Sequence, residues 1–252
     1  MNNIIYTYII PTYHLKFDML FKYMTLSYQK SRIYSLLKDK DKINCLLSEI
    51  FTKVIYSLVS KKKMDLIHIE RKNNGKPFIE NCIDFFFNIS HSTEYIIFTH
   101  TNHEIGCDIE LIQYLEKSII YHFFTKNEII LFENKTNKIK PNFFSTLVWT
   151  RKEAFFKLKG TGISDEITSI ETVISTDKNC YFCSYVFNNY IISLCSHLKK
   201  NVFFKYVNTL EFLNILNTNS GGNYGYSKNN LDLHSLCRCF SNINIPKVEL
   251  FY

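Results

Sequence analysis

The sequence predicts an α/β (α+β) fold made of two similar halves. Short apolar runs of strand character and segments with helical periodicity form groups that occur twice along the chain. The halves meet near residue 112, which gives an N-terminal half at residues 1–112 and a C-terminal half at residues 113–216. At 252 residues the chain is long enough to bury a substantial core. No direct repeat of residues is visible, so an internal duplication stays a hypothesis.

The first half is expected to contain one long helical region and several strands. Apolar residues between Ser27 and Val59 recur at helical spacing and predict one buried face. A basic run at Lys61–Lys63 follows, and the residues Asn73–Pro77 are typical of a turn. Short apolar runs predict five strands, of which the last is expected to join the same sheet as the two before it: Ile4–Ile10, Leu66–Glu70, Phe85–Ile89, Tyr95–Thr99 and Glu104–Ile112.

The second half also contains helical and strand segments, with the helices first. Helical periodicity runs from Tyr114 through Lys159, and strands return between Thr168 and Val207. After about Leu216 the composition changes to turn-forming residues, which predicts a flexible linker. Residues 217–252 are therefore interpreted as a linker and a semi-apolar tail that docks on the second half, with no function assigned.

The composition excludes a disordered chain, since 46% of residues are hydrophobic and 16% are aromatic. Lys and Asn interrupt every apolar run before it reaches membrane-spanning length, so no transmembrane helix and no membrane partner are expected. The N-terminus lacks the basic start and the small-residue cleavage site of a signal peptide. We infer a cytoplasmic location.

The net charge of +7 is enough to attract phosphates or acidic partners without identifying one. Nucleic acid is the default partner of a basic chain rich in tyrosine. However, Tyr, Phe, Asn, Lys and Ile are abundant everywhere, and Ala154 is the only alanine in the sequence. Because this bias runs through the whole chain, it gives no reason to expect a nucleic-acid partner.

The eight cysteines fall at irregular spacings and are interpreted as reduced and mostly buried. The alternative is a zinc site, because Cys180 and Cys183 form a C-x-x-C pair that His234, Cys237 and Cys239 could complete. The segment around the first pair alternates like a strand. Alternation would place Cys180 and Cys183 on opposite faces.

Glycine is rare, and four of the seven glycines lie outside the tail: Gly75, Gly106, Gly160 and Gly162. In so glycine-poor a chain, each is expected to supply a backbone conformation or a close approach that a side chain would block. An ordinary turn explains Gly75 equally well. Gly106 lies inside a strand pattern, where glycine indicates a bulge or a ligand against the backbone.

Two acids follow Gly106 at strand spacing. Asp108 and Glu110 would project from one face of the strand, while Cys107 and Ile109 take the other. Carboxylates held this close repel each other, and a divalent cation with a preference for oxygen ligands, such as Mg²⁺, would relieve the repulsion. The alternative is an edge strand that carries two acids on the surface.

A third group of charged residues lies on the helix that contains Trp149–Lys157. Glu153 and Lys157 are four residues apart and share a helical face. They could form a surface ion pair worth about 0.3–0.5 kcal/mol, and Thr150 with Glu153 could form a capping box, although helical periodicity already begins upstream at Pro141. The functional interpretation makes Glu153 a third oxygen ligand and places Lys157 on a phosphate, as phosphoryl transfer requires.

The segment Phe87–Ser92 closes a predicted strand with the sequence Ser90-His91-Ser92. A single histidine is usually structural. Flanked by two serines at a strand end, His91 also has the chemistry to hold phosphate oxygens.

Four segments in this order and spacing resemble the motif set of the Sfp-type 4'-phosphopantetheinyl transferases: Gly75–Pro77, Phe87–Ser92, Ile105–Glu110 and Trp149–Lys157. The similarity covers about Ile4 to Val207. The resemblance implies a monomeric pseudo-dimer of two α/β halves, each a small, mainly antiparallel sheet packed with helices. It also implies that coenzyme A binds between the halves and that Mg²⁺ binds its pyrophosphate.

The resemblance also implies a role for each matching residue. Asp108, Glu110 and Glu153 would hold the metal. Glu153, directly or through a water, would help to deprotonate a serine of an apo acyl or peptidyl carrier protein, which attacks the β-phosphate and releases 3',5'-ADP. Lys157 would neutralise charge on the pyrophosphate. The residues implied to contact coenzyme A are Lys30, Arg32, Gly75, Lys76, Pro77, Ser90, His91 and Lys157.

The chain departs from the family near its N-terminal helix. Where relatives commonly have an arginine followed by a hydroxyl residue, this sequence has Asn44 and Cys45. Lys30 and Arg32 are the plausible equivalents of the basic residues that hold the 3'-phosphate. Two other functions stay open: another Mg²⁺-dependent nucleotide phosphotransferase, and an inactive carrier-binding or nucleic-acid-binding module. No motif identifies the carrier protein or its pathway.

Overall fold

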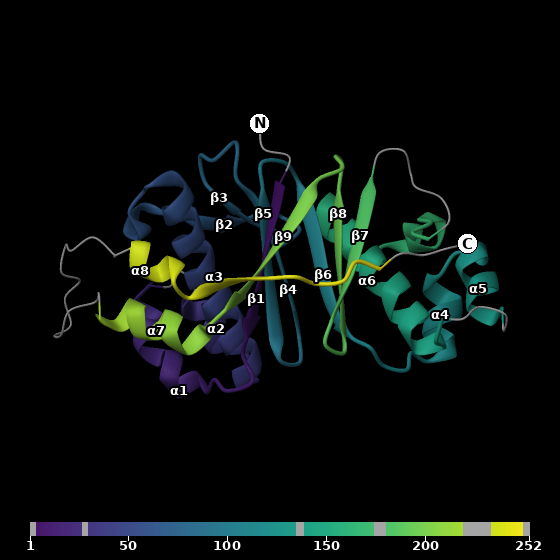
Figure 1. Ribbon diagram of the computed structural model, residues 1–252, viewed down its shortest axis with the longest axis horizontal. Coiled ribbons are helices and arrows are strands. Elements are labelled where there is room, and N and C mark those ends of the chain that lie inside the picture. The colour runs from purple at the N-terminus through teal and green to yellow at the C-terminus, as the bar shows by residue number, and fades with distance from the viewer. Residues whose placement is uncertain (1–3, 27–29, 135–138, 174–179, 219–232, 249–252) are drawn as a thin grey trace.

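Two β-sheets lie in the middle of the molecule, with helices on both outer sides (Figure 1). The structure is a computed structural model that describes residues 4–26, 30–134, 139–173, 180–218 and 233–248. Its strands are β1 (Ile4–Pro11), β2 (Ile69–Arg71), β3 (Pro77–Ile79), β4 (Phe86–Ser92), β5 (Tyr95–Thr101), β6 (Ile105–Leu111), β7 (Tyr181–Phe187), β8 (Tyr190–Ser196), β9 (Asn201–Val207) and β10 (Phe240–Ile243). Its α-helices are α1 (Phe17–Leu20), α2 (Lys30–Ser35), α3 (Asp39–Ser60), α4 (Lys117–Phe123), α5 (Lys126–Glu133), α6 (Pro141–Lys159), α7 (Thr209–Thr218) and α8 (Leu233–Cys237). Short 3₁₀ segments are η1 (Phe21–Leu26), η2 (Met64–Leu66) and η3 (Asp165–Ser169).

Of the two central sheets, the larger has the strand order β10-β9-β1-β5-β4 and the smaller has the order β6-β8-β7; β2 and β3 form a separate two-stranded sheet. Neighbouring strands are antiparallel except β1 and β9, which are parallel. Helix α3 lies on the outer side of the larger sheet together with α1, α2, α7 and α8, and α4, α5 and α6 lie on the outer side of the smaller sheet (Figure 1). The prediction of a mixed fold with mainly antiparallel sheets is confirmed.

The predicted membership of β6 is wrong. This strand was expected to join the sheet of β4 and β5, but it pairs along its whole length with β8, from Ile105↔Ser196 to Leu111↔Tyr190. It meets β4 through side chains instead, and the backbone N–H of Cys107 donates to Oδ1 of Asn88 at 3.0 Å. Conversely, β9, which belongs to the second half of the sequence, pairs with β1 of the first half. The two sheets therefore do not follow a division of the chain at residue 112.

Two apolar layers lie against the larger sheet, and two smaller clusters lie beneath α6 and between α4, α5 and α6. One lies between α3 and the larger sheet, where Phe51 of α3 packs edge-on against Tyr8 and Phe98. The other lies between the sheets and joins Ile9 and Ile97 to β6 and β8. Full burial of each such side chain contributes about 1.5–3 kcal/mol.

Helix α3 is long and apolar enough to cross a membrane by length and composition alone, although none was expected from the sequence. In the structure, 78% of its most apolar window is buried inside the protein. That burial is typical of a central core helix.

Two local expectations differ from the structure. The helical region predicted from Ser27 to Val59 contains two helices, α2 and α3, and residues 27–29 lie outside the described residues. The strand predicted at Leu66–Glu70 begins later, at Ile69, because Leu66 ends a 3₁₀ turn and is largely exposed.

The tail does not dock on the second half alone. Strand β10 extends the larger sheet beside β9, and Leu236 of α8 is buried in the core of α3. Further along, the N–H of Val248 donates to the carbonyl oxygen of Ser184 in β7 at 2.8 Å. The tail thus connects the two sheets.

All eight cysteines are free thiols. Cys180 packs in the cluster beneath α6, whereas Cys183 packs against the cluster between the sheets, which confirms that they lie on opposite faces. Within the part of the chain that the structure describes, no three His, Cys, Asp or Glu side chains gather as metal ligands. The side chain of His234, the fifth residue of the zinc alternative, lies outside the described residues.

Candidate functional site

The site is built where β6 crosses α6 with backbone in direct contact. A Cβ atom added to Gly106 would lie 1.9 Å from the carbonyl oxygen of Ala154 and 2.4 Å from the backbone nitrogen of Leu158. The expectation of a bulge or a ligand at Gly106 is wrong, because β6 pairs without interruption and a helix occupies the space. This close approach brings the acids of β6 beside the charged residues of α6.

Asp108 is the central acid of the site and is buried. Its Oδ1 atom accepts hydrogen bonds from Oγ of Ser90 at 2.7 Å and from Nζ of Lys157 at 2.6 Å. Its Oδ2 atom is buried without a hydrogen-bond partner. A carboxylate oxygen in this state is costly unless a ligand completes it, so Asp108 has one coordination position to offer.

Glu110 lies two residues further along the same face, as predicted. Its Oε2 atom accepts a hydrogen bond from Oγ of Ser92 at 3.2 Å. Burial and the neighbouring charge of Asp108 raise the pKa of Glu110 to about 7. Cys107 and Ile109 point into the core between the sheets, which confirms the predicted alternation.

Glu153 and Lys157 bring the charges of α6 to the same place. Burial and the charge of Asp108 raise the pKa of Glu153. Burial alone would lower the pKa of Lys157, but the nearby acidic groups, of which Asp108 has the largest effect, outweigh burial and raise the pKa. Lys157 is therefore paired with Asp108 across the site, and the surface ion pair with Glu153 is not the arrangement found. The helix begins at Pro141, so the capping-box alternative at Thr150 is excluded.

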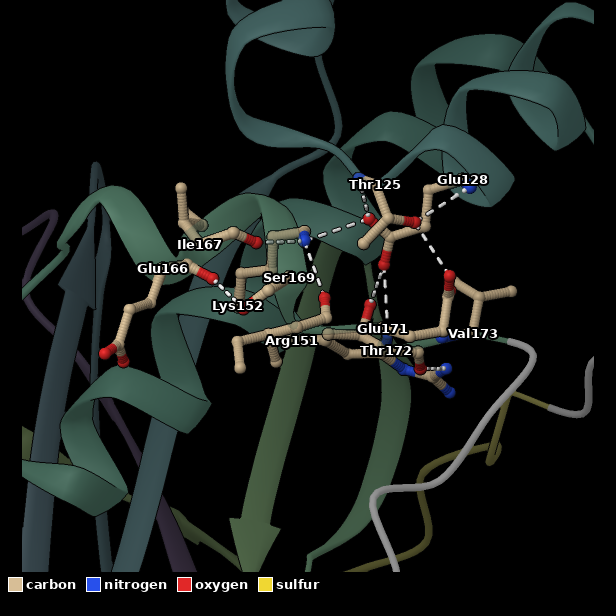
Figure 2. Close-up of polar contacts among 11 residues, drawn as sticks. Thr125, Glu128, Arg151, Lys152, Glu166, Ile167, Ser169, Glu171, Thr172 and Val173 are labelled. Carbon is tan, nitrogen blue, oxygen red and sulfur yellow. Dashed lines mark hydrogen bonds and ion pairs between the residues drawn. The ribbon is translucent and has the colours of Figure 1, made fainter.

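A buried polar network fixes α6 next to Glu153 (Figure 2). Lys152 and Glu128 form an ion pair at 3.0 Å, and both side chains are fully buried. The ammonium group of Lys152 also donates to the carbonyl oxygens of Ile167 and Ile170, each at 2.7 Å. Glu128 forms a capping box with Thr125 at the start of α5. Helices α5 and α6 are thereby joined to η3 and to the residue that follows it.

The turn that contains Gly75, Lys76 and Pro77 packs against the C-terminal end of α6. The ammonium group of Lys76 donates to Oε2 of Glu104 at 2.7 Å and to the carbonyl oxygen of Leu158 at 3.1 Å. Gly160, which ends α6 in a left-handed conformation, leaves room for this turn. The structure thus places the turn beside the helix of Glu153 and Lys157, with Lys76 already bonded to protein atoms.

The remaining predicted phosphate contacts are distributed around this centre. Ser90 faces Asp108. The next residue of β4, His91, is exposed, and the charges that act on it are those of Lys157, Asp41, Asp108 and Lys40.

Lys30 and Arg32 lie exposed on α2. The pKa of Arg71 is lowered, mainly by its burial and secondly by the positive charge of Arg32 nearby. Arg71 in turn donates to the carbonyl oxygen of Gly75 at 2.7 Å, which connects this basic group to the turn. Asn44, one of the two departures from the family, is buried with its Oδ1 atom unpartnered.

Sequence reasoning missed three residues of this region: Ser92, Lys152 and Arg71. Ser92 was seen only as a neighbour of His91. Lys152 was not singled out within its motif, because a lysine on a helix is normally solvated. No sequence pattern marks Arg71 as functional, apart from its position four residues before Gly75.

Two family models match adjacent parts of the chain. One, described as "4'-phosphopantetheinyl transferase, N-terminal", matches residues 13–103. The other, described as "4'-phosphopantetheinyl transferase superfamily", matches residues 104–207 and contains β6 and α6. The chain belongs to the 4'-phosphopantetheinyl transferase superfamily.

Curated relatives agree with this family assignment. The chain is 34% identical to the 4'-phosphopantetheinyl transferase gsp of Aneurinibacillus migulanus, over 52% of this chain and 54% of the relative. It is 32% identical to psf-1 of Bacillus pumilus, over 52% of this chain and 56% of the relative. With Sfp of Bacillus subtilis (strain 168) the identity is 29%, over 55% of this chain and 61% of the relative. The matches thus span little more than half the length of these relatives.

Proposed function

We propose that this phosphopantetheinyl transferase homologue moves the 4'-phosphopantetheine group of coenzyme A onto a serine of an apo acyl or peptidyl carrier protein. Membership of the superfamily supports this activity. The observation that carries the proposal is the state of Asp108, which is buried, bonded to Lys157 through one oxygen and open at the other. Such a group suits a site that receives a metal and phosphates.

The donor set fits Mg²⁺, which prefers oxygen ligands. Oδ2 of Asp108 is available, and Glu110 and Glu153 lie close enough for their charges to affect each other. Although the described residues form no ready cluster of three ligands, Mg²⁺ usually takes one or two carboxylates together with substrate phosphates. When bound, the ion would neutralise charge that builds up on the pyrophosphate of coenzyme A.

Residues of the chain would supply proton transfer, charge neutralisation and phosphate binding. The carrier serine oxygen would form a bond to the β-phosphorus while the bond to 3',5'-ADP breaks, and the serine proton would pass to the carboxylate of Glu153. The raised pKa of Glu153 suits a proton acceptor near neutral pH. Lys157 would neutralise the pyrophosphate, as electrostatic catalysis of phosphoryl transfer requires. Further phosphate and nucleotide contacts would come from Ser90, His91, Lys30, Arg32 and the turn at residues 75–77.

The proposal also covers the cellular location, the oligomeric state and the partners of the protein. We propose a cytoplasmic monomer whose partners are coenzyme A and the carrier protein, and not nucleic acid or membrane. The carrier would serve fatty acid, polyketide or nonribosomal peptide synthesis.

Mass spectrometry of the carrier tests the proposed activity. The protein is incubated with coenzyme A, Mg²⁺ and apo acyl or peptidyl carrier proteins, and each carrier is expected to gain the mass of one phosphopantetheine group. Asp108→Asn and Glu153→Gln should each reduce the rate by more than about a hundredfold, since each removes a charge on which the reaction depends. Glu80→Gln, which changes an exposed acid outside the site, serves as the control. An inactive binding module would leave every carrier mass unchanged.

A further inference from the structure

Two serines of β4 hold the two acids of β6 in the same way. Ser90 donates to Asp108 and Ser92 donates to Glu110, and each serine lies eighteen residues before its acid. Asp108 also has Lys157 as a donor, whereas the hydrogen bond to Glu110 comes from Ser92 across the gap between the two sheets. The direction of the Glu110 carboxylate therefore depends on where the end of β4 lies.

The end of β4 is fastened to the sheet that contains Glu110. Thr93, in the turn between β4 and β5, shares a hydrogen bond of 2.5 Å with the hydroxyl group of Tyr190. The same hydroxyl donates to Oε2 of Glu94 at 3.5 Å. Tyr190 is buried and pairs in β8 with Leu111, the residue after Glu110. The turn is thus held one residue away from the acid that Ser92 contacts.

The backbone of this turn indicates that the position is imposed. Thr93 has a φ of +22°, which is unfavourable for a β-branched residue. Such a conformation persists where its surroundings hold it in place. The two-residue loop that joins Ser92 to Tyr95 favours this conformation, and the contacts of Tyr190 with Thr93 and Glu94 add to the restraint.

We propose that Ser92 is a positioning residue that aims the carboxylate of Glu110 at the metal position beside Asp108, and that Tyr190 holds Ser92 there by fastening the β4–β5 turn. The assignment rests on the proposed function, because it takes the metal position from that proposal. Groups that orient ligating carboxylates typically change metal affinity or activity by 10–100-fold when removed. Neither Ser92 nor Tyr190 needs to touch the substrate for this role.

The test measures metal affinity apart from catalysis. Free Mn²⁺ is followed by electron paramagnetic resonance while it is titrated into the protein with saturating coenzyme A. Ser92→Ala is expected to raise the Kd for Mn²⁺ about tenfold. Ser92→Thr, which keeps a hydroxyl group, should restore most of the affinity, and Tyr190→Phe should raise the Kd by a smaller factor.

Ser118 offers a matched control, since its Oγ atom donates to Oε2 of Glu116 at 3.3 Å on the exposed part of α4. Ser118→Ala removes a serine–glutamate hydrogen bond of nearly the same length and should leave the Kd unchanged. Thermal unfolding of each variant separates a general loss of structure from a local loss of affinity.

A Kd for Ser92→Ala within twofold of the wild type would overturn the proposal, as would a wild-type protein that binds no Mn²⁺ beside coenzyme A. A wild-type protein that binds Mn²⁺ but transfers nothing to any carrier would overturn the proposed function alone. In that case the Kd of Ser92→Ala still decides the role of Ser92.

Discussion

Gly106 lets the strand with Asp108 and Glu110 touch the helix with Glu153 and Lys157. We expect Gly106→Ala to destabilise the protein by about 3 kcal/mol or more, because the new methyl group would overlap backbone atoms that cannot rotate away. The variant should also lose transfer activity, since β6 and α6 must separate. Urea denaturation and the carrier mass assay measure the two effects.

Gly162→Ala is the control for this substitution. A Cβ atom at Gly162 would meet nothing within 4 Å, although its φ of +70° is left-handed. The backbone penalty is about 1–2 kcal/mol. Equal losses of stability in the two variants would show that the contact between β6 and α6 is not what Gly106 provides.

His100 makes the stability of the core depend on pH. Its ring is buried and stacks on the rings of Phe85 and Tyr6, with ring centroids 4.9 Å and 5.3 Å apart. Burial, together with the charge of Lys205, lowers the pKa of His100 to about 3 in the folded protein, whereas the ordinary value is 6.5. The unfolded chain therefore binds a proton near pH 6.5 that the folded protein rejects, so this contribution to stability is complete above pH 6.5 and is lost as the pH falls.

The expected loss from His100 between pH 7 and pH 5 is about 2 kcal/mol. His100→Phe keeps an aromatic ring and removes the titrating group. From pH 7 to pH 5, the free energy of unfolding of this variant should therefore fall by about 2 kcal/mol less than that of the wild type. Urea denaturation of both proteins at the two pH values gives the comparison. Parallel pH dependence in the two proteins would contradict a neutral, buried His100.

At the scale of elements, the buried pair of Lys152 and Glu128 sets the position of α6 (Figure 2). Lys152→Met should destabilise the protein by about 3–5 kcal/mol, because the carboxylate of Glu128 stays buried without its partner charge. Adding Glu128→Gln should recover part of this loss by removing the isolated charge. Lys159→Met changes an exposed lysine of the same helix and should cost less than about 0.5 kcal/mol.

Thermal or urea denaturation measures all four proteins. If Lys152→Met alone were as stable as Lys159→Met, the network would not anchor the helix. If the double variant were less stable than Lys152→Met, the isolated charge of Glu128 would not be the cause of the loss.

Strand alternation and helical spacing in the sequence predicted which charged residues of the site share a face within each element. Alternation placed Asp108 and Glu110 on one face of β6, and four-residue spacing placed Glu153 and Lys157 on one face of α6. The contact that unites the two faces depends on Gly106 and a helix about fifty residues later in the sequence, which no local pattern reveals. The same limit applies to Ser92, because its bond to Glu110 crosses from one sheet to the other.

At the scale of the whole molecule, each half of the sequence contributes a strand to the sheet of the other. β6 precedes residue 112 and pairs with β8, and β9 follows it and pairs with β1. The tail then connects the sheets through β10 and Val248. The sequence showed two groups of strands and helices, but pairing between strands that lie about eighty (β6 and β8) or about two hundred residues apart (β1 and β9) leaves no local signal, so this exchange was not predicted.

The exchange predicts that neither half folds alone. A fragment of residues 1–112 would expose the edge of β1 that pairs with β9 from Ile4↔Asn201 to Ile9↔Tyr206, and it would leave β6 without its partner strand. Residues 113–252 would lack the same contacts and the apolar layer between the sheets. Each fragment by itself should show no cooperative urea transition by circular dichroism, whereas an equimolar mixture should regain one. A cooperative transition in fragment 1–112 alone would show that the larger sheet is stable without β9, and then the two sheets would be independent units instead of one interlocked structure.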